Sequence, residues 1–208
     1  MYISNMRYLF LINVVLCTQC AMSQIVVDSI KVDPLVLDVY ERQTNTSRMG
    51  MTSLNAWAVS NIAVGSIAFN GSTGKERYFH QMNIFWNVVN LSIGIPGLIG
   101  TYKNRAKDFE SVYKYQKKLE NVYVLNMGLD IGYIATGWAL DNFGKTKTGV
   151  TADRFKGYGN SLVMQGSYLL LHDLVMYFFY KSNNKRLDQV WKRVSIHPEG
   201  LGVIIKLN

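Results

Sequence analysis

The sequence has few of the residues that disulfides, metal sites and covalent catalysis need. It contains 2 cysteines and 3 histidines among 208 residues. Cys17 and Cys20 lie within an N-terminal segment that has the features of a removable export signal, so we expect a mature chain without a thiol. The histidines at positions 80, 172 and 197 lack a second ligand at a spacing typical of metal motifs. We therefore expect no disulfide, no metal and no cofactor.

The motifs of common enzyme classes are also missing. The chain contains no serine nucleophile elbow, phosphate-binding glycine loop, dinucleotide fingerprint or zinc-protease helix motif. A membrane-embedded hydrolase based on His172 and Asp173 has no identifiable nucleophile. Enzymatic activity is therefore the least favoured class of function.

Acidic residues are scarce relative to basic ones. The chain has 14 Asp and Glu against 22 Lys and Arg, which gives a net charge of +8. The basic residues concentrate in connecting stretches such as 103–118 and 181–193, without a recognition motif, so no nucleic-acid partner is expected. Basic segments beside apolar blocks are typical of proteins that meet anionic lipid headgroups. The charge pattern thus favours a lipid bilayer as a partner.

The N-terminal segment predicts export. Residues 8–17 form an apolar run, and Ala21 and Ser23 occupy the minus-three and minus-one positions of the expected cleavage site. The run is too short for a membrane span, which needs about 20 residues. We predict a signal peptide at residues 1–23 and a single domain at residues 24–208, because the remaining length suits one compact domain.

Four apolar blocks dominate the predicted domain. They comprise residues 49–74, 78–102, 121–140 and 157–180, and only the last two contain an acidic residue. Each block is long enough to span a bilayer, and charge-free windows of this length are rare in soluble helices. The sequence therefore predicts an all-α fold, a four-helix membrane bundle, in a bacterial cell envelope with the inner membrane favoured.

The segments between the blocks give more local predictions. Pro34 is expected to start a short helix within a polar segment at residues 24–48. The basic stretch 103–120 is expected to be an amphipathic helix that continues into the third block, because its apolar residues recur at steps of three and four. Glycine-containing links are predicted at residues 71–77 and 141–156.

Two further predictions concern helix packing and the C-terminus. Gly128 and Gly132 have the four-residue spacing that favours close contact between helices. Turn residues between two short apolar runs predict a short C-terminal β-hairpin within residues 194–207.

A soluble periplasmic helical bundle with a polar core is the alternative architecture, and an outer-membrane location also stays open. The blocks contain more Asn, Ser and Gly than lipid-facing helices require. In addition, a cleaved signal followed by four spans would place most Lys and Arg outside the cytoplasm, which opposes the positive-inside rule. The membrane architecture is nevertheless favoured, because of the length of the charge-free windows.

Polar residues within the blocks form a candidate polar core. The residues that recur on helical faces or carry a titratable group are Asn83, Asn87, Asn90, Asn126, Asp130, Tyr133, Gln165, His172 and Asp173. The first three share one face of the second block and the next three share one face of the third, so the two stripes are expected to hydrogen-bond across a helix pair. A proton or cation pathway is the alternative role for this core.

Three sequence runs carry a family resemblance. These are YFHQMN at 78–83, LNMGLD at 125–130 and GYGN at 157–160, each followed by further polar residues at helical spacing. Over residues 50–180 the chain resembles an uncharacterised family of small Bacteroidetes envelope proteins. The resemblance implies a helical membrane protein of bacterial origin, and it supplies no catalytic residues because that family has no assigned function.

The leading functional prediction is a non-enzymatic integral envelope protein, acting as a scaffold or an accessory subunit of a membrane assembly. Its expected partners are the lipid bilayer and other envelope proteins or further copies of itself. The alternative is a small ion-coupled or proton-coupled carrier or channel that uses Asn87, Asn126, Asp130 and His172 in its polar core.

Overall fold

The computed structural model describes residues 33–193 and the two-residue segments 195–196 and 203–204. The chain divides into two units, Met1–Asp33 and Pro34–Asn208, and all elements described below belong to the second. The predicted signal peptide at residues 1–23 lies outside the described residues and stays a prediction.

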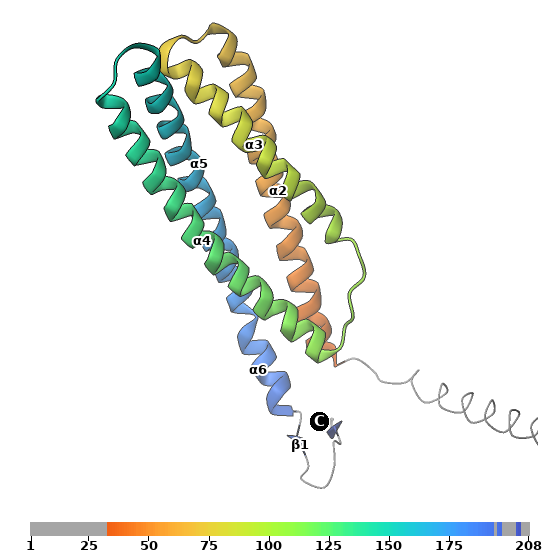
Figure 1. Ribbon diagram of the computed structural model, residues 1–208. Helices are drawn as coiled ribbons and strands as arrows, with labels where there is room; N and C mark the ends of the chain where they lie inside the picture. The colour runs from red at the N-terminus through yellow and green to blue at the C-terminus, as the bar shows by residue number, and fades with distance from the viewer. Residues whose placement is uncertain (1–32, 194, 197–202, 205–208) are drawn as a thin grey trace, which may run out of the picture. The chain divides into compact units, whose positions relative to one another are not determined.

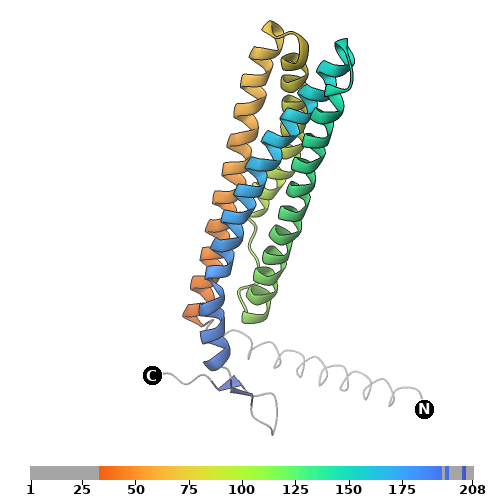
Figure 2. The same cartoon turned by 90° about the vertical axis from the view of Figure 1, so that its left-hand side faces the viewer.

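The described chain is helical, which confirms the all-α class. Its helices are α2 (Pro34–Gly71), α3 (Gly74–Gly100), α4 (Phe109–Lys145), α5 (Gly149–Ser182) and the short α6 (Asn184–Arg193). The four long helices run lengthwise beside one another (Figures 1 and 2). Helix α2 packs along α3, α4 packs along α5, and α3 contacts α5, so α5 connects the two helical hairpins.

The links within each helical hairpin are shorter than predicted. Only residues 72–73 separate α2 from α3, and only residues 146–148 separate α4 from α5. The longer links predicted at 71–77 and 141–156 are therefore wrong. The glycine that begins α3 has a φ of 57° and the one that begins α5 has a φ of 58°. This left-handed conformation is readily adopted by glycine, so the chain turns sharply and the next helix starts at once.

Helix α2 is also longer than predicted. The short helix expected within residues 24–48 is instead the first part of one helix that runs from Pro34 through the first apolar block to Gly71. Proline suits the first position of a helix because the missing N–H is not needed there. Gln43 and Ser47, which lie in the segment that was predicted to be polar, are buried at 0% and 6% exposure.

Helix α4 confirms the predicted continuation of the basic amphipathic stretch into the third apolar block. It begins at Phe109 rather than at residue 103, because Asp108 forms its N-cap. The Asp108 carboxylate accepts a hydrogen bond from the backbone N–H of Ser111 at 2.9 Å. Such a bond satisfies one of the free donors in the first helical turn.

The close contact between helices is made by other glycines than predicted. A Cβ atom added to Gly128 or Gly132 would meet nothing within 4 Å, so the packing role predicted for these two residues is wrong. A Cβ on Gly137 of α4 would instead lie 2.6 Å from the carbonyl oxygen of Gly159 of α5. In the same way, a Cβ atom added to Gly159 would lie 2.5 Å from the carbonyl oxygen of Gly137. These two glycines let the helix backbones approach closely.

The C-terminal residues show a minimal strand pairing. Strand β1 (Ser195–Ile196) is antiparallel to β2 (Val203–Ile204), with Ser195 opposite Ile204 and Ile196 opposite Val203. Two residue pairs do not establish the predicted β-hairpin, and its connection at 197–202 lies outside the described residues. The hairpin therefore stays a prediction.

Two helical segments are long and apolar enough to cross a membrane by length and composition. They are Gly74–Gly100 and Gly149–Lys192. This property favours membrane association. Helices α2 and α4 do not meet the same criterion, so the four spans expected from the sequence are not shown.

Candidate functional site

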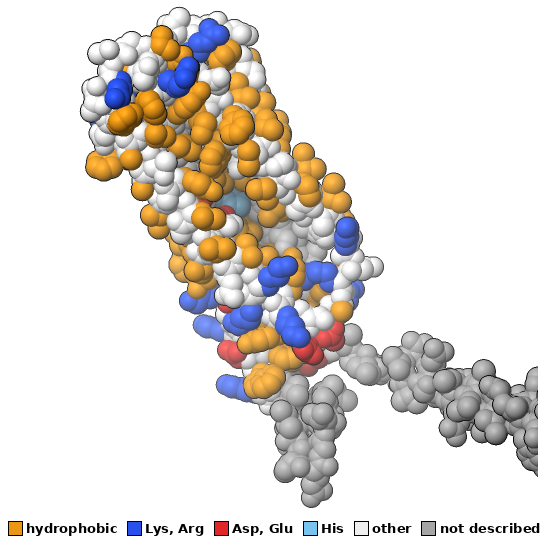
Figure 3. All heavy atoms as spheres, in the orientation of Figure 1, with side chains coloured by type: hydrophobic (Ala, Val, Ile, Leu, Met, Phe, Trp, Pro, Cys, Tyr) orange, Lys and Arg blue, Asp and Glu red, His pale blue; other side chains and the backbone are white. Residues whose placement is uncertain are grey.

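The interior holds polar side chains beside apolar ones, and many large apolar side chains lie on the outer faces of the helices. The buried polar residues are Gln43, Ser47, Asn83, Asn87, Asn90, Gln116, Asp130, Ser161, Gln165, Asp173 and Asn183. By contrast, Ile67 on α2 is 79% exposed, Leu125 on α4 is 65% exposed and Phe85 on α3 is 61% exposed. Figure 3 shows this apolar surface between two ends that carry Lys and Arg. The candidate site is therefore the polar interior, which contains three groups of residues along the helices.

The first group, the amide layer, joins α2, α3 and α5. It consists of Trp57, Asn61, Asn83, Asn87, Asn90 and Gln165. Trp57 Nε1 donates to Gln165 Oε1 at 2.9 Å, and Gln165 Nε2 donates to Asn83 Oδ1. Asn83 Nδ2 in turn donates to Asn61 Oδ1 at 2.9 Å. Side chains from three helices thus satisfy each other in the interior.

The asparagine stripe on α3 has a different partner from the one predicted. Asn83, Asn87 and Asn90 do share one buried face, and Asn90 Nδ2 donates to Asn87 Oδ1 at 3.2 Å. Their interhelical hydrogen bonds reach α2 and α5, so the predicted bonding to the α4 stripe is wrong. The described contact from α3 to that stripe is aromatic, with the rings of Trp86 and Tyr133 4.7 Å apart and nearly perpendicular.

The second group, the His–Asp centre, consists of Gly50 on α2, Asp130 on α4, and His172 and Asp173 on α5. His172 Nδ1 lies 2.8 Å from Asp173 Oδ1, and His172 Nε2 lies 3.1 Å from the Gly50 carbonyl oxygen. Adjacent helical residues point about 100° apart, yet the side chains of His172 and Asp173 contact each other directly.

Asp130 is the least satisfied member of the His–Asp centre. It is 3% exposed and within electrostatic range of Asp173 and His172. Its Oδ2 atom is buried and has no hydrogen-bond partner among the described residues. A carboxylate in such a position is costly unless it gains a proton, a cation or a donor. Asn126, one turn earlier on α4, is half-buried.

An apolar groove gives access to the His–Asp centre from the side. It has a volume of about 300 Å³, lies between α2 and α5, and includes His172 in its wall together with Met49, Ser53 and Phe179. Tyr168 also lines it, with its ring 3.8 Å from the Trp57 ring and 6.0 Å from the His172 ring. The described residues contain no group of three His, Cys, Asp or Glu placed to hold a metal ion.

The third group, the glutamine layer, was missed by sequence reasoning. Gln43 Nε2 on α2 donates to Gln116 Oε1 on α4 at 3.0 Å, and Gln116 Nε2 donates to the Tyr180 carbonyl oxygen on α5. The Ser47 and Tyr180 hydroxyls lie 2.5 Å apart. The available signal was Gln116 itself, because it falls on the apolar face of the amphipathic stretch, where a polar residue needs an interior partner.

The fold and its interior define a helical protein with many apolar side chains on its outer surface and with polar as well as apolar side chains in its core. The model of a family of unknown function, DUF6992, matches residues 53–174, and the chain belongs to this family. The match includes every predicted member of the polar core and confirms an uncharacterised family, whereas the Bacteroidetes origin stays a prediction. No curated protein and no solved structure matches the chain.

Proposed function

We propose that the chain is a non-enzymatic integral membrane protein of a bacterial cell envelope that acts as a scaffold or an accessory subunit of a membrane assembly. The observation that carries this proposal is the placement of amides between the helices and of large apolar side chains on their outside. In water, that arrangement would expose many large apolar side chains, and extended exposed apolar surface is uncommon on soluble monomers. In lipid, the same surface is favourable and the interior bonds are retained.

Helix length supports four spans under this proposal. The charge-poor stretches of the four long helices hold about 20 to 26 residues, which is roughly 30 to 39 Å of helix and matches a hydrocarbon core of about 30 Å. Helices α2 and α4 have a lower mean hydropathy because their interior faces carry polar residues. Their outer faces are apolar, as Val64, Ile67, Leu125 and Ile131 illustrate with exposures of 62%, 79%, 65% and 58%.

The hydrogen bonding supports a structural role for most of the polar core. Within the amide layer and within the glutamine layer, the polar side chains hydrogen-bond to one another rather than point into a common cavity. Interhelical bonds of this kind contribute about 0.6 kcal/mol each in a membrane. Such layers hold helices together, and the outer apolar surface is left to contact lipid and partner subunits.

Fractionation tests this proposal. A full chain with a C-terminal tag is expressed, inner and outer membranes are separated, and each is washed at alkaline pH. We expect the protein in a wash-resistant membrane pellet. Recovery in the soluble fraction would contradict membrane insertion, and robust substrate turnover by the purified chain would contradict a non-enzymatic role.

One observation favours a second candidate, a small proton-coupled or cation-coupled carrier. Asp130 Oδ2 is buried, has no hydrogen-bond partner among the described residues and lies within electrostatic range of His172 and Asp173. Titratable groups in such positions commonly mark ion pathways in membranes. Proteoliposomes with an internal pH-sensitive dye test this candidate under an imposed pH gradient. A carrier requires flux that Asp130→Asn abolishes and that Glu110→Gln, on the exposed surface of the same helix, retains; absence of flux in the unmodified protein would overturn it.

A further inference from the structure

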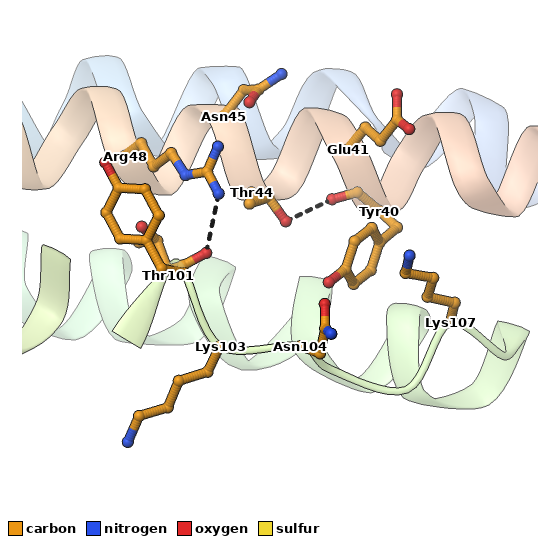
Figure 4. Close-up of a pocket in the computed structure, with 10 residues that line it drawn as sticks. Tyr40, Glu41, Thr44, Asn45, Arg48, Thr101, Lys103, Asn104 and Lys107 are labelled. Carbon is orange, nitrogen blue, oxygen red and sulfur yellow. Dashed lines mark hydrogen bonds between the residues drawn. The ribbon is translucent and has the colours of Figure 1, made fainter. Parts of the chain in front are cut away.

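A second cavity lies at the end of the helices where the charge-free stretches stop. It has a volume of about 320 Å³ and lies between α2 and the connection from α3 to α4, with Tyr40, Thr44, Arg48, Thr101, Lys103 and Lys107 in its wall (Figure 4). Arg48 is the last charged residue before the charge-free stretch 49–74, and Thr101 lies near the end of the stretch 78–102. In a membrane, this basic cavity would lie at headgroup depth.

The wall of the cavity carries more basic than acidic residues. Among the described residues, Arg48, Lys103 and Lys107 form no ion pair, whereas Arg42 and Lys117 pair with acidic side chains. Glu41 is the one acidic residue in the wall, and Figure 4 shows its side chain directed away from the connection. The electrostatic character of the cavity is therefore positive.

Arg48 has unused hydrogen-bonding capacity. Its Nη2 makes one long bond, 3.4 Å, to the Thr101 carbonyl oxygen, and its Nε is buried without a partner among the described residues. The guanidinium also lies 4.5 Å from the centre of the Tyr102 ring. An arginine has five N–H donors in a planar fork that matches phosphate oxygens. Arg48 is thus held in place by Thr101 and Tyr102, and its remaining donors have no hydrogen-bond partner among the described residues.

Lys107 supplies a second positive charge across the cavity. Its Nζ lies 5.1 Å from the centre of the Tyr40 ring, and in Figure 4 Arg48 and Lys107 lie on either side of Thr44 and Tyr40. Lys103, an exposed residue, extends away from α2 in the same view. A cation on each side of the cavity suits an anionic phosphate, whose oxygens accept charge-assisted hydrogen bonds.

We propose that this cavity binds the phosphate headgroup of an anionic phospholipid, with Arg48 and Lys107 as its cationic contacts. The choice of a lipid over a soluble phosphate rests on the membrane embedding proposed above, because the cavity lies where the apolar stretches end. The exposed Tyr102 is consistent with that depth, since tyrosine is enriched at membrane interfaces. Basic pockets between transmembrane helices bind anionic lipid headgroups in membrane proteins.

Thermal unfolding of the purified full chain in a neutral detergent tests the proposal. The detergent is mixed with dioleoylphosphatidylglycerol in one series, dioleoylphosphatidylcholine in a second and inorganic phosphate in a third. We expect the first to raise the unfolding temperature at the lowest concentration. Each of Arg48→Gln and Lys107→Gln is expected to weaken the apparent affinity for phosphatidylglycerol about fivefold, which corresponds to about 1 kcal/mol per cation.

Two control variants match the tested ones. Arg42→Gln removes a cation from the same helix outside the cavity, and Lys147→Gln removes a loop lysine that lies over a phenylalanine ring at the opposite end. Both are expected to retain the affinity of the unmodified chain. The proposed site would be overturned if phosphatidylcholine raised the unfolding temperature as much as phosphatidylglycerol does. It would also be overturned if the control variants lost as much affinity as the tested variants. Equal stabilisation by inorganic phosphate would overturn the lipid as its ligand. Alkaline fractionation tests membrane embedding independently. If the chain fractionates as an integral membrane protein but shows no lipid preference, only the lipid site is refuted and the proposed embedding is unaffected.

Discussion

Gln165 shows how a single buried amide can organise a helical bundle. Its oxygen accepts from Trp57 on α2 and its nitrogen donates to Asn83 on α3, while the residue itself belongs to α5 and is 0% exposed. In a lipid setting there is no water to replace these bonds. One side chain therefore favours a particular arrangement of three helices over others that leave its amide unpaired.

We expect Gln165→Leu to destabilise the protein by about 1 to 3 kcal/mol, because it removes two bonds and leaves Trp57 Nε1 without its acceptor. The measurement is the free energy of unfolding in mixed detergent micelles. Gln189→Leu on the exposed surface of α6 is the matched control and is expected to change it little. An equal loss of unfolding free energy in both variants would show that the hydrogen bonds of Gln165 do not stabilise the packing of the three helices.

Helices α4 and α5 pack closely where glycine leaves no side chain between their backbones. A methyl group on Gly137 would lie 2.6 Å from a backbone oxygen of α5, which cannot move without separating the helices. Gly128, on the same helix, has nothing within 4 Å. Substitution by alanine therefore adds the same methyl group at both positions, against a neighbouring helix at Gly137 and into open space at Gly128.

Gly137→Ala is expected to destabilise the α4–α5 hairpin by about 1 to 3 kcal/mol through overpacking. Gly128→Ala is expected to be neutral or slightly stabilising, since alanine is the better helix former. Unfolding midpoints of the two variants against the unmodified chain check this difference. If Gly137→Ala is as stable as Gly128→Ala, the close contact between α4 and α5 is wrong.

The start of α4 makes a pH-dependent contribution. The Ser111 backbone N–H and then its hydroxyl stabilise the charged carboxylate and hold the pKa of Asp108 below its ordinary value. A lowered folded-state pKa means that the cap stabilises the helix fully above the unfolded value, about 3.9, and loses this effect as the pH falls through the folded value. Asp108→Ala is expected to cost about 1 kcal/mol at pH 7 and progressively less below pH 4. The check is the difference in unfolding midpoint between the two proteins across this pH range; a constant difference would contradict the capping role.

The sequence predicted the helices better than their ends or partners. Helical periodicity correctly placed Asn83, Asn87 and Asn90 on one buried face, because spacing determines which residues share a face. It did not indicate that the partner of Asn83 is Gln165, because spacing within one helix carries no information about the neighbouring helix. Gly128 and Gly132 were misassigned for the same reason. The link lengths were wrong because charged residues continue through the ends of the helices.

At the scale of the whole molecule, the two ends of the helices differ in charge. The links at 72–73 and 146–148 lie at one end, and the connection from α3 to α4 lies at the other together with α6 (Figure 1). Most Lys and Arg belong to the second end, which the positive-inside rule assigns to the cytoplasm. The predicted export signal assigns the same end to the outside. Labelling of each end therefore determines the orientation as well as the number of spans.

Cysteine labelling gives the sharpest test of four spans. Replacing Cys17 and Cys20 with serine leaves a chain without cysteine, into which single cysteines are introduced. Because the two short links lie at the same end, Thr73→Cys and Thr148→Cys are expected to react with a membrane-impermeant maleimide from one side of the membrane, and Asn104→Cys from the other.

Val64→Cys provides the discriminating control in the same experiment. The Val64 side chain is 62% exposed, so a soluble bundle would label there as readily as at the links. In a bilayer this position faces hydrocarbon, where a charged maleimide does not enter and the thiol is rarely ionised. We expect no labelling at Val64→Cys in membranes and full labelling after denaturation. Rapid labelling at all four positions in intact membranes would contradict the embedding, because the apolar outer surface would then be in contact with water.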